Sequence, residues 1–134
     1  MKKNYMIDQA IAVHCETLYF DLHNEYDFKQ FNFKVDSKTL SLLFEPNIYA
    51  SNDNKKLGGI TMIFSSVDYL EVSHDFVNHV THSLIEMGYK TPNDKDLDWL
   101  ITEKNFEADH HVVLRFSNDE YIRLHCLDSI ISTK

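Results

Sequence analysis

Side chains that suit metal binding recur at helical spacing between residues 75 and 86. Four of them stand four, three and four residues apart, namely Asp75, His79, His82 and Glu86. If the segment is a helix, this spacing stacks them along one face, and imidazole and carboxylate groups are ligands for zinc and similar ions. The apolar residues of the segment fall almost opposite the row, so we expect the row to face water. Because a catalytic metal needs a partly dry pocket with supporting groups, we predict no bound metal and at most a partner contact.

Signatures of nucleophilic or phosphate chemistry are missing from the sequence. No serine sits in a glycine-flanked elbow, and Gly58 and Gly59 are not followed by a helix that would complete a phosphate-binding loop. The two cysteines, Cys15 and Cys126, have no metal or redox spacing; we expect buried free thiols, with a disulfide between them as the alternative. The eight histidines are scattered along the chain. We therefore predict a protein that has no cofactor and is not an enzyme.

Charge is the most informative bulk property. The chain has 13 basic and 21 acidic residues, a net charge of −8. Such a surface repels nucleic acid and anionic membranes and attracts basic proteins. One acidic run surrounds the single tryptophan, and aromatic anchors rimmed by acids suit a basic protein surface. We predict that this run binds a partner through Asp94, Asp96, Asp98, Trp99 and Glu103. A second acidic patch comprises Glu16, Asp21 and Glu25. The alternative is that the charge serves only solubility.

Two segments have the apolar periodicity of amphipathic helices. Residues 5–23 place most of their aliphatic side chains on one face, although Val13 and Phe20 break the pattern. Residues 75–88 form a second apolar stripe, and Gly88 is well placed to end that helix. Residues 97–106 fit either a short helix or an edge strand.

The remaining elements are predicted strands. Residues 26–35 alternate with a change of phase at Lys29-Gln30 that indicates a bulge, and a polar turn at 36–38 leads to a partner strand at 39–44. A central strand begins at Ile60 and breaks at Ser65-Ser66. Residues 112–116 and 121–127 form a terminal hairpin, with Arg115 and Arg123 expected on its wet face. We therefore predict an α+β fold: a mainly antiparallel sheet, built from a meander and a C-terminal hairpin, with two or three helices on one face.

The chain has the size of one domain, residues 1–134, which is long enough to bury a core without disulfides. Its apolar runs are too short to cross a membrane. The N-terminal residues Lys2 and Lys3 resemble the start of a signal peptide, but charged and polar residues interrupt the apolar part that should follow. We expect a cytoplasmic protein that binds neither nucleic acid nor membrane.

Three segments together resemble a known class of protein: LSLLF (40–44), GGITMIFSSVDYLEV (58–72) and VVLRFSNDEYIRLHC (112–126). Their order is similar to that in small α+β bacterial immunity proteins, which neutralise the toxins of polymorphic or contact-dependent inhibition systems. The resemblance implies a small, acidic, cytoplasmic protein without catalytic activity. It carries over no individual functional residue.

Charge and resemblance lead to one function. We predict a non-catalytic immunity protein that binds and neutralises a basic toxin domain, such as a nuclease. Two alternatives belong to other classes: a subunit of a small homo-oligomeric structural or regulatory protein, for instance a homodimer, and a small enzyme whose site combines dispersed histidines and acids.

Overall fold

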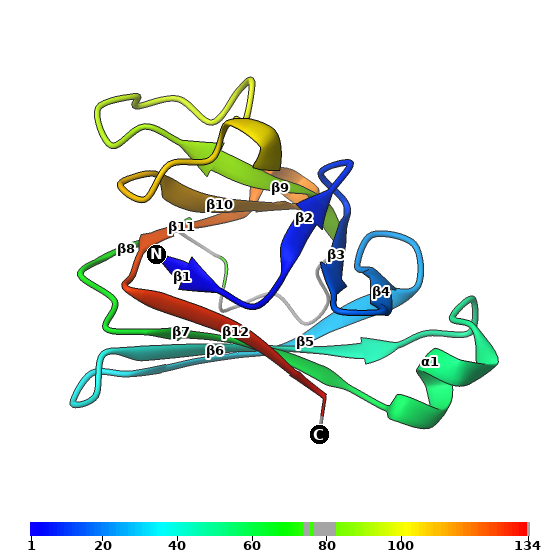
Figure 1. Cartoon of the computed structure of the whole chain (residues 1–134). Coiled ribbons are helices and arrows are strands. Elements are labelled where there is room, and N and C mark those ends of the chain that lie inside the picture. Colours follow the sequence, from blue (N-terminus) through cyan, green and yellow to red (C-terminus); the bar gives the residue numbers. More distant parts are fainter. Residues whose placement is uncertain (74–75, 77–82, 134) are drawn as a thin grey trace.

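The computed structural model describes residues 1–73, 76 and 83–133, and these residues form three antiparallel-rich sheets (Figure 1). The five-stranded sheet has the order β1 (Lys2–Lys3), β12 (Asp128–Thr133), β7 (Ile60–Ser65), β6 (Thr39–Pro46), β5 (Tyr26–Lys34). The four-stranded sheet has the order β8 (Tyr69–Val72), β11 (Tyr121–His125), β10 (His111–Phe116), β9 (Leu84–Lys90). The small sheet consists of β2 (Met6–Asp8), β3 (Ala12–Cys15) and β4 (Leu18–Asp21).

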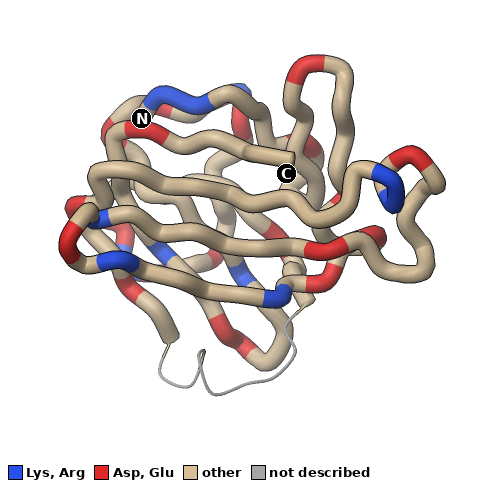
Figure 2. Tube along the Cα trace, turned by 90° about the horizontal axis from the view of Figure 1, so that it is seen from below, with Lys and Arg blue, Asp and Glu red and all other residues tan. Residues whose placement is uncertain are grey.

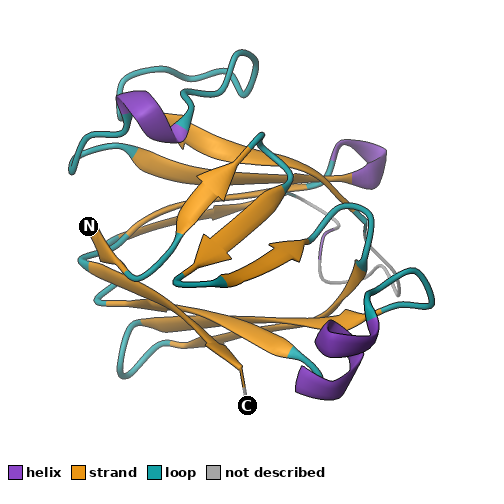
Figure 3. Cartoon of the chain, turned by 45° about the vertical axis from the view of Figure 1, so that its right-hand side comes forward, coloured by secondary structure: helices purple, strands orange, loops and turns teal. Residues whose placement is uncertain are grey.

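The two larger sheets lie one above the other, and the small sheet closes one side between them (Figures 1 and 3). In β6 and β7, buried residues that face the other sheet alternate with more exposed ones, as expected for packed sheets, whereas β10 is buried on both of its faces. Phe64 in β7 is fully buried between the two larger sheets. An aromatic cluster joins the layers: the rings of Phe28 and Phe44 lie 5.3 Å apart, and Phe116 lies 5.1 Å from Phe28 and 5.0 Å from Phe76.

Strands with a local partner follow the sequence pattern. β5 and β6 form the predicted hairpin, and the register shifts between Phe28 and Gln30, at the predicted bulge. β7 ends at the serines, and Ser66 has a positive φ of 54° that turns the chain out of the five-stranded sheet. β10 and β11 form the predicted terminal hairpin. Arg123 is nevertheless buried, so its predicted place on a wet face is wrong.

The predicted α+β class is wrong. The structure is 52% strand and 10% helical, so helices do not form a layer over the sheet. Within the described residues, the one α-helix is the six-residue α1 (Asn52–Leu57), and three-residue 3-10 turns occupy Glu103–Asn105 and Ser117–Asp119. β12 was also not predicted; it pairs with β7 as an additional strand of the five-stranded sheet.

Residues 5–23 are strands, not a helix. Val13 and Phe20, which break the helical pattern, face each other across β3 and β4 and are both fully buried. The turn between β2 and β3 uses Gln9 and Ala10 with φ of 52° and 62°, and Glu16 has φ of 56° in the next turn. The small sheet contacts the edge of β9, where Met87 N–H donates to Ala10 O over 2.7 Å.

The predicted helix at 75–88 is wrong over residues 84–88, which belong to β9 and pair with β10. Gly88 lies inside this strand, where a Cβ atom would come within 2.9 Å of Leu100 Cβ. Residues 97–106 form neither predicted element: Ile101 makes an isolated bridge with Tyr89, and a 3-10 turn follows at Glu103–Asn105. Over the described ranges, the chain has no helix with the length and apolar character needed to cross a membrane.

Candidate partner-binding loop

The loop at residues 91–100 covers the outer face of the four-stranded sheet. Arg123 Nη2 donates to Thr91 O over 3.0 Å, and Arg115 Nη1 donates to Leu97 O over 3.3 Å. The loop then returns to the sheet, where Ile101 exchanges both backbone hydrogen bonds with Tyr89 at 2.7 and 3.0 Å. The basic side chains of this face are thus tied to loop carbonyl groups.

Lys90 in β9 binds two of the acidic side chains of this loop. Its side chain is 4% exposed, and Nζ lies 3.0 Å from Asp94 Oδ2 and 2.8 Å from Asp96 Oδ1. The hydrogen bond from Lys90, followed by that from Asp98 N–H, lowers the pKa of Asp96. Burial alone would lower the pKa of Lys90, but the hydrogen bonds to Asp96 and Asp94 outweigh it and raise that pKa above its ordinary value.

The three aspartates of the predicted binding surface therefore lie together but are partly neutralised. Asp98 Oδ1 lies 3.6 Å from Arg115 Nη1, and its N–H donates to Asp96 Oδ1 over 3.0 Å. The side chains of Asp94, Asp96 and Asp98 remain 41%, 65% and 72% exposed. They can contact a partner, although Lys90 and Arg115 reduce their net charge.

Trp99 projects from this loop into solvent. It is 93% exposed, and its φ of 58° lies in the left-handed region. A residue with a side chain adopts this conformation at a cost of about 1–2 kcal/mol. The bridge between Ile101 and Tyr89 fixes the chain two residues later. The side chain of Trp99 is therefore exposed on the same loop as the three aspartates, where an anchor for a partner could lie.

Glu103 does not belong to this surface. It accepts hydrogen bonds from the ammonium of Lys3, from Ile7 N–H at 2.9 Å and from Tyr89 O–H at 2.7 Å. Lys3 Nζ also lies 5.0 Å from the ring centroid of Phe106. Glu103 thus joins the N-terminal strands to the four-stranded sheet, and the structure brings only four of the five predicted partner-binding residues together.

The second acidic patch is spread over a different corner and serves the chain locally. Asp21 accepts from His23 N–H and Asn24 N–H at 3.1 and 2.9 Å, and Glu25 accepts from Ser51 N–H at 3.0 Å. Asp21 therefore orders the turn between β4 and β5, and Glu25 binds Ser51, the N-cap residue of α1.

The predicted metal row is only partly described. Asp75, His79 and His82 lie outside the described residues. Glu86 lies in β9, and Arg115 Nη1 donates to its Oε1 over 3.4 Å. Its carboxylate therefore has a basic partner from the neighbouring strand.

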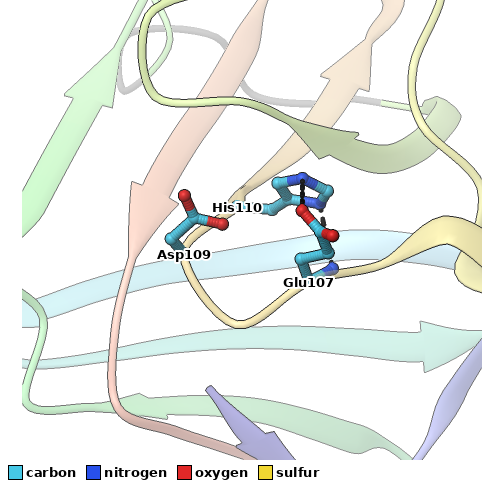
Figure 4. A group of neighbouring side chains, drawn as sticks. All are labelled: Glu107, Asp109 and His110. Carbon is cyan, nitrogen blue, oxygen red and sulfur yellow. Dashed lines mark hydrogen bonds and ion pairs between the residues drawn. The ribbon is translucent and has the colours of Figure 1, made fainter.

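A different group, Glu107, Asp109 and His110, has ligand atoms within 4.8 Å of one another (Figure 4). His110 Nδ1 accepts from Glu107 N–H at 3.1 Å, so the neutral ring carries its proton on Nε2, which faces Glu107 Oε2 at 3.6 Å. A metal on Nε2 would have to displace that proton while Nδ1 still faces a donor. The arrangement is that of a histidine ordering its own turn.

Beside this turn, a second group of rings lies on the outer face of the four-stranded sheet. The rings of Tyr69 and His111 stack with centroids 4.6 Å apart, and His111 Nδ1 accepts from Arg123 Nε over 2.9 Å. Burial, followed by the charge of Arg123, lowers the pKa of His111. His125 Nδ1 lies 2.6 Å from Asp68 Oδ1. These polar groups bind one another, as in a structural network.

The cysteines are free, as predicted, although only Cys126 is buried and Cys15 is half-buried. Burial raises the pKa of Cys126 to about 12, so its thiol is a poor nucleophile.

Comparison with known proteins gives no relative: no family model, no curated protein and no solved structure matches this chain.

Proposed function

We propose that this chain is a non-catalytic cytoplasmic protein that binds a basic protein partner through the loop at residues 91–100. The observation that carries the proposal is Trp99, whose side chain is 93% exposed on a left-handed backbone, in the same loop as Asp94, Asp96 and Asp98. An exposed aromatic held at a conformational cost is of no use to the fold, whereas tryptophan is enriched among the residues that dominate binding energies.

Charge and anchor have different roles in this proposal. Because Lys90 and Arg115 offset the loop aspartates, long-range attraction comes from the net charge of −8 of the whole chain. Attraction of this kind increases the association rate and weakens as salt screens it. Burial of the indole then slows dissociation.

A toxin domain, such as a nuclease, is the basic partner that we favour. A nuclease has a basic surface for nucleic acid, and an acidic protein that covers this surface would block it. The α+β fold that the immunity-protein resemblance implied is not the fold of this chain. The toxin form of the proposal therefore rests on charge and on the exposed anchor.

The test is protection from the product of the neighbouring reading frame, expressed in the same cells with and without this chain. We expect growth arrest that the wild-type chain relieves and that Trp99→Ala fails to relieve. Tyr49→Ala is the matched control, because Tyr49 is 74% exposed at a distant corner beside α1, and it should protect like wild type.

Binding of the purified proteins completes the test. The association rate of wild type should fall by about ten-fold or more between low and high salt, with a smaller change in the dissociation rate. Trp99→Ala should mainly increase the dissociation rate. A non-toxic neighbour would refute the toxin form, and equal affinity of Trp99→Ala and wild type for a confirmed basic partner would refute the binding loop.

A further inference from the structure

The outward side of the five-stranded sheet has an uncharged centre. The register places two rows of four residues on it: Ile130, Ile63, Ser41 and Asn32 in one, and Ser132, Thr61, Leu43 and Gln30 in the other. Figure 2 looks onto this side, and the middles of β12, β7 and β6 carry no charge, whereas the edge strand β5 has the exposed Lys29 at its bulge, beside Gln30. We call these eight residues the neutral face.

The neutral face combines aliphatic and small polar side chains. Ile130 is 44% exposed, and Ile63 and Leu43 are half-buried between their neighbours. A quarter of the chain is charged, and the outward side of a sheet is a usual place for charge. Depletion of charge around aliphatic residues is instead typical of the centre of a protein interface.

From this face we infer that two copies of the chain form a dimer by stacking their five-stranded sheets. Each copy has a net charge of −8, so two copies repel each other over most of their surfaces. The neutral face is where a second copy can approach with little repulsion. A basic partner, in contrast, would gain no electrostatic attraction from it.

Charges lie at the edges of the face, and two opposite ones, Asp128 and Lys34, favour one orientation of the dimer. Lys29 and the pair Asp27 and Glu45 are further charges on the β5 side. Asp128 lies opposite Ser65 at the β12 side, and Lys34 lies opposite Thr39 at the β5 side. The pairing of Leu40 with Phe64 puts these residues at the same end of the sheet. Lys2 in β1 lies beside Asp128 and is the other charge at that corner.

A twofold axis that runs along the strands lays the β12 side of one copy over the β5 side of the other. Asp128 of each copy then lies over Lys34 of the other, which gives two equivalent ion pairs. Packed sheets adopt this roughly aligned arrangement, with an angle of about 30° between strand directions. An axis across the strands would not bring these opposite charges together.

This inference does not rest on the proposed function. The neutral face and the loop at residues 91–100 lie on opposite sides of the molecule (Figure 1). A dimer would therefore leave both loops free for partners. Either proposal can fail without affecting the other.

The mass in solution of the full chain tests the dimer. We expect twice the 15.8 kDa of one chain at about 100 µM, with dissociation on dilution, as for an interface of micromolar affinity. Ile130→Lys should give the monomer mass at the same concentration. Ile85→Lys is the matched control, since Ile85 is 45% exposed in β9 of the other sheet, and it should remain dimeric.

Charge exchange tests the orientation. Asp128→Lys and Lys34→Asp should each weaken the dimer by about ten-fold, and the double variant should regain most of the wild-type affinity. These exposed positions keep the test decisive if Ile130→Lys fails to fold. A monomeric wild type at about 1 mM, equal effects of Ile130→Lys and Ile85→Lys, or no recovery in the double variant would overturn the inference.

Discussion

Lys90 donates to Asp96 across 2.8 Å, and this bond ties the acidic loop to the strand from which it leaves. The two groups differ in their surroundings: the Lys90 side chain is 4% exposed, and that of Asp96 is 65% exposed. If Lys90 is removed, water can solvate the exposed aspartate. If the aspartate is removed, the buried ammonium of Lys90 loses its partner and has little access to water.

This asymmetry gives a prediction. Lys90→Met releases aspartates that water can solvate, and it should lower the free energy of unfolding by about 1 kcal/mol. The double variant Asp94→Asn with Asp96→Asn leaves Lys90 without a carboxylate, and it should lower the free energy of unfolding by more than Lys90→Met does. Urea unfolding measures both. A larger loss for Lys90→Met than for the double variant would contradict this account.

The same pair predicts a pH dependence. The pKa of Asp96 is lowered in the folded state, so its contribution to stability is present above the unfolded pKa of about 4 and is lost as the pH falls through the folded value. The stability of Asp96→Asn should therefore vary less between pH 5 and pH 3 than that of wild type, taking about one unit on either side of that pKa.

Asp36→Asn, an exposed change in the β5–β6 turn, is the control and should keep the wild-type profile. The pKa of Lys90 is raised, so its contribution is present below the unfolded pKa of about 10.4 and is lost as the pH rises through the folded value. Parallel acid profiles for wild type and Asp96→Asn would show that the bond does not affect folding.

Phe64 tests the core. It is fully buried in β7 between the two larger sheets, and Phe64→Ala should cost about 3–5 kcal/mol because the cavity cannot fully collapse. Thr61→Ala, on the outward side of the same strand, should stay within about 1 kcal/mol of wild type. Thermal or urea unfolding compares them, and similar stabilities would mean that the strand faces are reversed.

A substitution at Ala10 tests the turn between β2 and β3, which the sequence did not predict. The φ of 62° at Ala10 is strained for alanine, and Ala10→Gly should raise the free energy of unfolding by about 0.5–1 kcal/mol after the entropy of the unfolded glycine is subtracted. Ala12→Gly, at a fully buried position in β3, should lower it by about 1 kcal/mol. A destabilised Ala10→Gly would contradict the left-handed conformation.

Residues 5–23, which were predicted to be a helix but contain three short strands, show why the predicted fold class was wrong. Strands of three or four residues are too short to establish a period of two, so their apolar residues also fit a helical stripe. Gln9, Ala10 and Glu16 take left-handed conformations in the turns, although turn prediction relies on glycine, asparagine or aspartate at such positions. By contrast, β5 and β6 are long and joined by a short polar turn, which makes their pairing a local property.

The candidate site was predictable in part for a similar reason. Asp94, Asp96, Asp98 and Trp99 are close in sequence, so their clustering is visible without a structure. Nothing local indicates that Lys90 is buried or that Glu103 binds Lys3, because these facts depend on contacts between distant segments. The sequence therefore predicted the surface but not the ion pairs that hold it.

Substitutions of Trp99 should affect the stability of the fold and the binding of a partner in different ways. Glycine adopts a φ of 58° without steric cost, and the indole is almost fully exposed. Trp99→Gly should therefore raise the free energy of unfolding by about 0.5–1 kcal/mol, while it removes the anchor and weakens binding of the basic partner by more than ten-fold, as expected of an interface residue worth about 2 kcal/mol. Trp99→Ala keeps the strain and should lose binding without gaining stability. Urea unfolding and binding kinetics on the two variants distinguish the roles. A loss of stability in Trp99→Gly would assign the indole to the fold, and the proposed binding loop would lose its main support.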